Sequence, residues 1–193
     1  MTVTIWLDPV CPFSWNTARW LLAAADADGF TIEWKQLSLA ILNEGREMPE
    51  PLRQRMADSR AIGRLMAAIR ADAGEHAMVT AYLEFGRRHF DQSIPVGDGL
   101  IDDVLKAAAV TRLTRDMVNS TRHDAVIAAS HRAGQAAYGD TVGSPLLTIG
   151  GRTFFGPVLT DLPAPQQAAQ TFSAVATLAA MGEFTQLERP RKH

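Results

Sequence analysis

The stretch DPVCPFSW, residues 8–15, lies between a predicted strand and a predicted helix, and it decides how the fold is interpreted. Residues 3–7 before it are rich in β-branched and aromatic side chains, which favours a strand. Residues 12–28 after it repeat apolar side chains at spacings of three and four, which predicts a helix, and Gly29 is a stop signal. Residues 31–37 form a second predicted strand. This β-α-β order favours a parallel pair of strands.

A long helical segment then interrupts the strands. Residues from about 51 to 138 are rich in alanine, arginine and methionine, and almost no strand pattern occurs among them. Thr121 and Asp124 have the spacing of a capping box, which predicts the start of a helix. Helical spacing and stop signals together predict helices over residues 52–73, 76–89, 100–110 and 121–138.

Strands return near the C-terminus. Residues 146–149 and 152–155 are predicted strands joined by Gly150-Gly151, a good two-residue hairpin turn, and a helix is predicted over residues 165–181. The order β-α-β, helical insert, β-β-α predicts an α/β protein with the thioredoxin fold and an inserted α-helical domain. We expect the thioredoxin-like domain to comprise residues 1–45 and 139–193, and the helical domain to comprise residues 46–138.

Cys11 is the one cysteine of the chain and is expected at the N-terminus of the first helix. Unpaired backbone N–H groups and the positive end of the helix dipole favour thiolate over thiol at such a position, and the thiolate is the nucleophile. Pro12 suits the first helical turn, where its missing N–H costs nothing. A lone cysteine is often only a small buried apolar residue. Its place between two prolines at a strand-to-helix turn favours a reactive thiol.

A second candidate segment is VGSP, residues 142–145. A proline directly before a strand that follows a helical insert can have a cis peptide bond, and in a thioredoxin fold this proline lies beside the cysteine. The backbone of the preceding Ser144 can then pair with an extended thiol substrate. By itself, Pro145 is equally compatible with an ordinary trans loop.

Four segments together resemble actinobacterial DsbA-like proteins, and most of all the mycothiol-dependent nitroreductase and disulfide-reductase group. The segments are residues 8–15, residues 38–44 (SLAILNE), residues 142–145 and residues 154–159 (FFGPVL). The Cys-Pro-x-x-Trp pattern is shared with wider relatives, whereas residues 38–43 and 154–159 are more specific. The resemblance spans nearly the whole chain. It implies a thioredoxin fold with a helical lid, a nucleophilic Cys11, a cis Pro145 and mycothiol as the thiol cofactor.

The resemblance and the motif together define an expected site. We expect Cys11, Ser14 and Pro145 to take part in catalysis. The residues expected to contact the low-molecular-weight thiol, mycothiol or a related compound, are Pro12, Phe13, Trp15 and Ser144. The helical insert would cover the cleft.

Ser14 is a departure from the family pattern, which often has a second cysteine at this position. A serine cannot resolve a disulfide, so Cys11 would form a mixed disulfide and be released by an external thiol. Ser14 can also donate a hydrogen bond to the thiolate and lower its pKa further. An engineered cysteine replacement that traps mixed disulfides would show the same residue.

Composition limits the partners that we expect. The 193 residues carry a net charge of −2 and a pI of about 6.2, which does not indicate nucleic-acid binding or a polybasic membrane patch. No apolar run is long enough for a membrane span, and the N-terminus is not typical of a signal peptide. One cysteine excludes an internal disulfide and favours the cytoplasm. The scattered histidines predict no metal site, and either a monomer or a homodimer is expected.

Two other classes of function remain open. Kappa-class glutathione transferases and 2-hydroxychromene-2-carboxylate isomerases share the fold and a related motif, in which the first position activates a thiol cofactor; Ser14-Trp15 fits that pattern and Cys11 fits it less well. A chaperone-like domain without catalysis could bind unfolded chains through methionines of the insert. These methionines are Met48, Met56, Met66 and Met78, and methionines at helical spacing are more often core residues.

Overall fold

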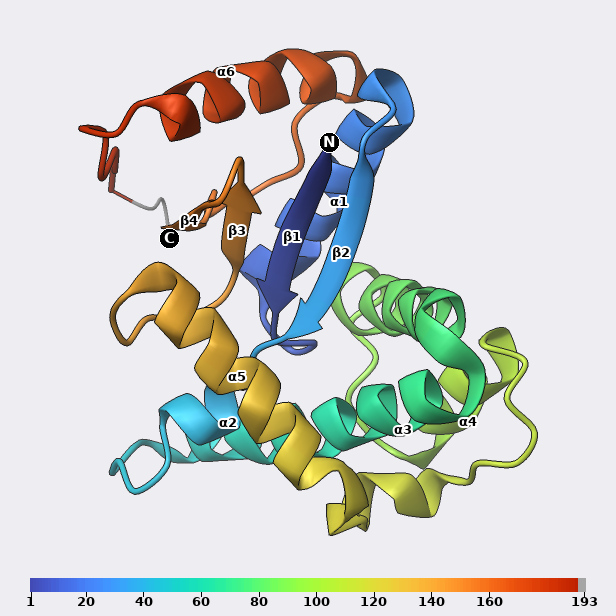
Figure 1. Ribbon diagram of the computed structural model, residues 1–193. Helices are drawn as coiled ribbons and strands as arrows, with labels where there is room; N and C mark the ends of the chain where they lie inside the picture. The colour runs from blue at the N-terminus through green and yellow to red at the C-terminus, as the bar shows by residue number, and fades with distance from the viewer. Residues whose placement is uncertain (191–193) are drawn as a thin grey trace.

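The computed structural model describes residues 1–190 and contains one four-stranded sheet (Figure 1). The strand order is β2-β1-β3-β4. Figure 1 shows the helical insert gathered at the end of the sheet where β1 and β2 finish. The strands are β1 (Thr2–Leu7), β2 (Thr31–Gln36), β3 (Leu146–Ile149) and β4 (Arg152–Phe155).

The pairing of the strands confirms the predicted topology. β1 and β2 are parallel, with Ile5 opposite Trp34, whereas β3 is antiparallel to both β1 and β4. Gly150 and Gly151 have φ angles of 58° and 80°, both positive as a type I′ hairpin turn requires. The first residue of β3 therefore lies beside the C-terminal end of β1, which brings the segment before β3 next to the segment after β1.

Helices α1 (Pro12–Asp28) and α6 (Ala168–Ala180) pack against each other beside the sheet. α1 ends as the sequence predicts, because Gly29 adopts the left-handed conformation and its N–H caps the carbonyl of Ala25. The predicted helix over residues 165–181 is a 3₁₀ turn (Pro165–Gln167) followed by α6. Phe172 of α6 stacks on Phe30, which lies between α1 and β2, with ring centroids 4.3 Å apart.

The insert contains one long, interrupted helix. The helix predicted over residues 52–73 is the first part of α3 (Glu50–Gly86), which breaks at Gly74, where φ is 85°. The helix predicted over residues 76–89 is the second part of α3, and its last three residues already belong to the π-helix that follows. Figure 1 shows the chain changing direction within α3. The remaining elements are α2 (Leu39–Leu42), the π-helix Arg87–Asp91, α4 (Asp98–Ala107), two 3₁₀ turns (Arg115–Asn119 and Thr121–His123) and α5 (Asp124–Tyr138). Within residues 1–190, no helix has the length and apolar character needed to cross a membrane.

The predicted capping box at Thr121 is wrong. Ser120 caps this segment instead, because its side chain accepts a hydrogen bond from the N–H of Arg122 at the start of a 3₁₀ turn. α5 starts only at Asp124 and ends at Tyr138, and Gly139 after it has the left-handed conformation of a helix stop. The domain boundaries at residues 45 and 139 stay a prediction.

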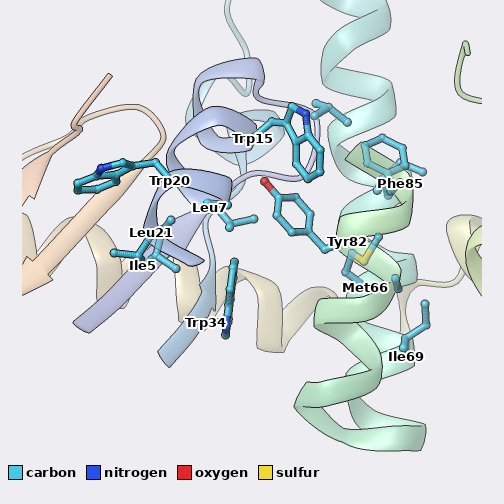
Figure 2. Close-up of a cluster of buried hydrophobic side chains, with 14 of the residues drawn as sticks. Ile5, Leu7, Trp15, Trp20, Leu21, Trp34, Met66, Ile69, Tyr82 and Phe85 are labelled. Carbon is cyan, nitrogen blue, oxygen red and sulfur yellow. The ribbon is translucent and has the colours of Figure 1, made fainter. Parts of the chain in front are cut away.

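The main core lies between β1, β2, α1 and both parts of α3 (Figure 2). Trp15, Tyr82 and Phe85 are buried there, with Trp34 contributed by β2. Met66 is also buried in this core, and none of the insert's three other methionines named above is fully exposed. The insert therefore does not offer these methionines as an open apolar surface.

Candidate active site

Cys11 lies in a tight turn between β1 and α1. Its N–H donates to the carbonyl of Asp8 at 3.1 Å, and its own carbonyl accepts from the N–H of Trp15 at 3.1 Å, which starts the helix. Pro12 occupies the first helical turn, as predicted. The sulfur of Cys11 is thereby placed at the N-terminus of a 17-residue helix, where backbone amides and the dipole favour negative charge.

Ser144 and Pro145 lie directly beside Cys11, and the bond between them is cis, as predicted. The thiol of Cys11 donates to the carbonyl oxygen of Ser144 at 3.4 Å. The hydroxyls of Ser14 and Ser144 share a hydrogen bond of 2.6 Å. The structure thus brings together four of the predicted site residues from segments about 130 positions apart in the sequence.

The buried side chain of Asp8 holds the segments of this site together through hydrogen bonds. The Asp8 side chain is fully buried, and it accepts hydrogen bonds from the N–H of Val10 at 2.9 Å, from the N–H of Leu39 at 2.6 Å and from the hydroxyl of Ser59. The N–H of Asp8 donates to the Ser144 hydroxyl at 2.9 Å. Asp8 therefore joins the turn that carries Cys11 to α2, to α3 and to the Ser144 loop.

Burial raises the pKa of the Cys11 thiol above its usual value. The Ser14 hydroxyl and the amides of Ser14 and Phe13 act in the opposite direction, while the negative charge of Asp8 adds to the increase. Only 4 % of Cys11 is exposed, so the cost of desolvating a thiolate outweighs the helix N-terminus. The sequence predicts a lowered pKa for Cys11, and this prediction is wrong. In this structure Cys11 is a thiol at neutral pH.

We predict that alkylation of Cys11 by iodoacetamide has a pH midpoint above that of the same protein unfolded in urea. The unfolded chain should titrate near the free-cysteine value of about 8.5, and its single cysteine makes the assignment direct. The folded state holds the proton more tightly, so the free energy of unfolding should also fall as the pH rises above about 8.5. A folded-state midpoint below that of the unfolded chain would contradict the burial argument.

Trp15 lies in the core and not in an open cleft. Its ring is 4 % exposed and packs edge-on against Tyr82 and face-on against Phe90. Its indole N–H donates to Asp91 at 3.0 Å, and the guanidinium of Arg19 lies 4.6 Å from the ring centroid. Trp15 therefore fixes α1 against the insert, and its predicted contact with a thiol cofactor stays a prediction.

Pro12 and Phe13 are half-buried and border the buried sulfur. They are the predicted cofactor-contacting residues that retain accessible surface next to Cys11. Two hydrogen bonds hold the other side of α1 to the FFGPVL segment, from Thr17 to the carbonyl of Pro157 at 2.7 Å and from Asn16 to that of Leu159 at 3.0 Å. The Gly156–Pro157 bond is also cis, which the sequence analysis did not predict.

The buried polar residues Asp8 and Ser59 are not among the site residues expected from the sequence. His131 is also buried and accepts a hydrogen bond from the N–H of Ser38 at 3.3 Å. Across residues 1–190 no group of three or more histidine, cysteine, aspartate or glutamate side chains is arranged to hold a metal ion.

Solved structures share the whole fold of this chain. A 2-hydroxychromene-2-carboxylate isomerase covers 92 % of this chain and 96 % of its own, at a TM-score of 0.61 and 18 % identity. The cytosolic disulfide reductase DsbM from Pseudomonas aeruginosa, solved with GSH, covers 92 % and 100 %, at 0.60 and 14 %. The probable DsbA oxidoreductase SCO1869 from Streptomyces coelicolor covers 98 % and 94 %, at 0.61 and 19 %. At these identities the likeness establishes a DsbA-like thioredoxin fold.

Sequence comparison is more specific. The uncharacterized protein Rv2286c of Mycobacterium tuberculosis is 30 % identical over 196 residues, which cover 98 % of this chain and 82 % of that protein. A family model described as Rv2466c-like, mycothiol-dependent nitroreductase Rv2466c, matches residues 10–189 and so includes Cys11, Ser144 and Pro145. With nearly its full length matched, the chain belongs to the Rv2466c-like family of mycothiol-dependent nitroreductases.

Proposed function

We propose that this protein is a thiol–disulfide oxidoreductase in which Cys11 is the single nucleophile and mycothiol is the reducing thiol. Family membership supports an oxidoreductase that works with a thiol. The observation that carries the finer proposal is the 3.4 Å contact between the Cys11 sulfur and the Ser144 carbonyl, next to the cis bond. When Cys11 ionises, that carbonyl becomes free to accept an N–H of an extended thiol partner. Cytoplasmic location is part of the same proposal.

The proposed reaction needs no second cysteine. The Cys11 thiolate attacks one sulfur of a mixed disulfide between mycothiol and a substrate thiol, forms a Cys11–mycothiol disulfide and expels the substrate thiolate. The proton that Cys11 loses balances the one that this thiolate takes up. A second mycothiol then attacks the protein-bound disulfide, which restores Cys11 and releases mycothiol disulfide. Ser14 holds Ser144 in place and takes no part in exchange.

Reduction of a nitro compound would use the same oxidation of mycothiol to its disulfide. Two mycothiol molecules become one disulfide and supply two electrons, which convert a nitro group to a nitroso group with release of water. Here Cys11 would again carry one mycothiol as a mixed disulfide. The half-buried Pro12 and Phe13 would border the incoming compound.

Intact mass spectrometry tests the proposal. After incubation with mycothiol disulfide, wild-type protein should gain the mass of one mycothiol, and reduced mycothiol should remove it. Cys11→Ser is the matched control and should gain nothing. A glutathione adduct without a mycothiol adduct would overturn the choice of thiol, and the absence of both adducts would overturn the single-cysteine mechanism.

A second candidate is an enzyme that activates a thiol cofactor without disulfide exchange. The Ser14 hydroxyl lies in the same hydrogen-bonded group as Ser144, where a cofactor sulfur could be held. Conjugation of glutathione to chlorodinitrobenzene that persists in Cys11→Ser and is lost in Ser14→Ala would favour this candidate. Loss in Cys11→Ser would exclude it.

A further inference from the structure

Two buried hydrogen-bond donors, one at the end of β2 and one on α3, have no partner among residues 1–190. They are the hydroxyl of Tyr82 and the side-chain Nε2 of Gln36. Both residues line one cavity of about 30 Å³ between β2 and α3. By the size that a single water molecule needs, this cavity has room for one or two non-hydrogen atoms. Its walls are otherwise apolar side chains and two cations.

The cavity adjoins the turn that carries Cys11. Leu7 and Pro9 line it, and Pro9 lies two residues before the cysteine. Figure 2 shows the Tyr82 hydroxyl pointing away from α3, toward Leu7 and Trp15 at the start of α1. Burial raises the pKa of Tyr82 well above its usual value, and the negative charges of Cys11, once it ionises, and of Asp8 add to the increase. The phenol therefore stays protonated and remains a donor.

The two cations of the cavity already have partners. Lys35 pairs with Glu33 at 3.1 Å, and Arg70 donates to the carbonyl of Trp34 at 2.8 Å and pairs with Glu75. A phenylalanine would fill the space of the Tyr82 ring without burying a hydroxyl that lacks a partner. Of the cavity-lining residues that the structure describes, Tyr82 and Gln36 thus carry the fully buried side-chain donors that have no partner, and both can bind an oxygen acceptor.

We propose that Tyr82 and Gln36 recognise an oxygen of the thiol compound that reacts at Cys11, through hydrogen bonds donated by the Tyr82 hydroxyl and the Gln36 amide. The acceptor class is a hydroxyl or amide oxygen, which mycothiol carries on its sugar, inositol and cysteinyl groups. This inference rests on the proposed function and assigns Tyr82 as a residue that determines which thiol is accepted. A water molecule held by the same two donors is the competing occupant.

Tyr82→Phe separates these two occupants. The rate of adduct formation is measured against mycothiol disulfide concentration, and the half-saturating concentration should rise about tenfold, the effect of one lost hydrogen bond. The limiting rate and the alkylation rate of Cys11 by iodoacetamide should stay as in the wild type. Tyr138→Phe is the control, because Tyr138 is the chain's other tyrosine and is 38 % exposed on α5. Gln36→Met, similar in shape, should act in the same direction.

An unchanged half-saturating concentration in Tyr82→Phe, with its fold verified by circular dichroism, would overturn the inference and leave water as the occupant. If wild-type protein forms no adduct at all, this result contradicts the proposed function but not the role of Tyr82. Calorimetric titration of reduced mycothiol into Cys11→Ser, with and without Tyr82→Phe, then decides the inference separately. Weaker binding in the double variant supports recognition by Tyr82, and equal binding or none overturns it.

Discussion

Replacing Asp8 by asparagine is expected to lower the free energy of unfolding by about 1–3 kcal/mol, because a buried donor loses its acceptor. The charge itself is not the cause of the loss, since burial raises the pKa of the Asp8 carboxyl. The two carboxylate oxygens accept hydrogen bonds from Val10, Leu39 and Ser59. An asparagine has one oxygen and one NH₂ group, so at least one of these buried donors would face another donor. Urea unfolding followed by circular dichroism measures the loss.

The same variant should increase the thiolate fraction of Cys11. The Asp8 charge is one of the causes that raise the pKa of this thiol, so the alkylation midpoint should move to lower pH in Asp8→Asn. Asp26→Asn is the control, since Asp26 is exposed on α1 and such changes usually alter stability by less than about 0.5 kcal/mol. An Asp8→Asn protein that unfolds at the wild-type urea concentration would show that the carboxylate does not hold the turn.

Gly86→Ala is expected to lower the free energy of unfolding by about 1–3 kcal/mol through overpacking. Gly86 has helical φ and ψ angles, and alanine in such a position normally stabilises a helix. Here an added Cβ would lie 2.3 Å from an atom of the Trp15 ring. The ring cannot easily move aside, because Trp15 is buried and bound to Asp91.

Gly99→Ala provides the matched control for this prediction. Gly99 lies in the first turn of α4, and an added Cβ would meet no atom within 4 Å. This variant should be as stable as the wild type or more stable by up to about 1 kcal/mol. Equal urea midpoints for Gly86→Ala and Gly99→Ala would mean that α1 and α3 do not meet as closely as described.

Local patterns were sufficient to predict the elements on either side of Cys11. The helix over residues 12–28, the strands that flank it and the glycine hairpin all agree with the structure. Each depends on side-chain periodicity or on a stop signal within a few residues. The four-residue helix α2 was missed, because so short a segment has no measurable periodicity.

The site itself was only partly predictable. Cys11, Ser14, Ser144 and Pro145 were named from motifs, and the structure brings them together. The hydrogen bonds of buried Asp8 could not be inferred, because its distant partners lie in three separate segments, α2, α3 and the loop before β3. The direction of the Cys11 pKa shift was mistaken for the same reason: a helix N-terminus is a local feature, whereas burial depends on tertiary packing.

The contacts that enclose Cys11 also determine when during folding the sulfur is covered. They join residues 133, 76 and 51 positions apart, from Cys11 to Ser144, from Trp15 to Asp91 and from Asp8 to Ser59. Contacts with such long sequence separation carry a large loop-closure cost and form after local helices and hairpins. A newly synthesised chain therefore exposes its one sulfur to cellular oxidants until its last segments have docked, and only the finished molecule shields it.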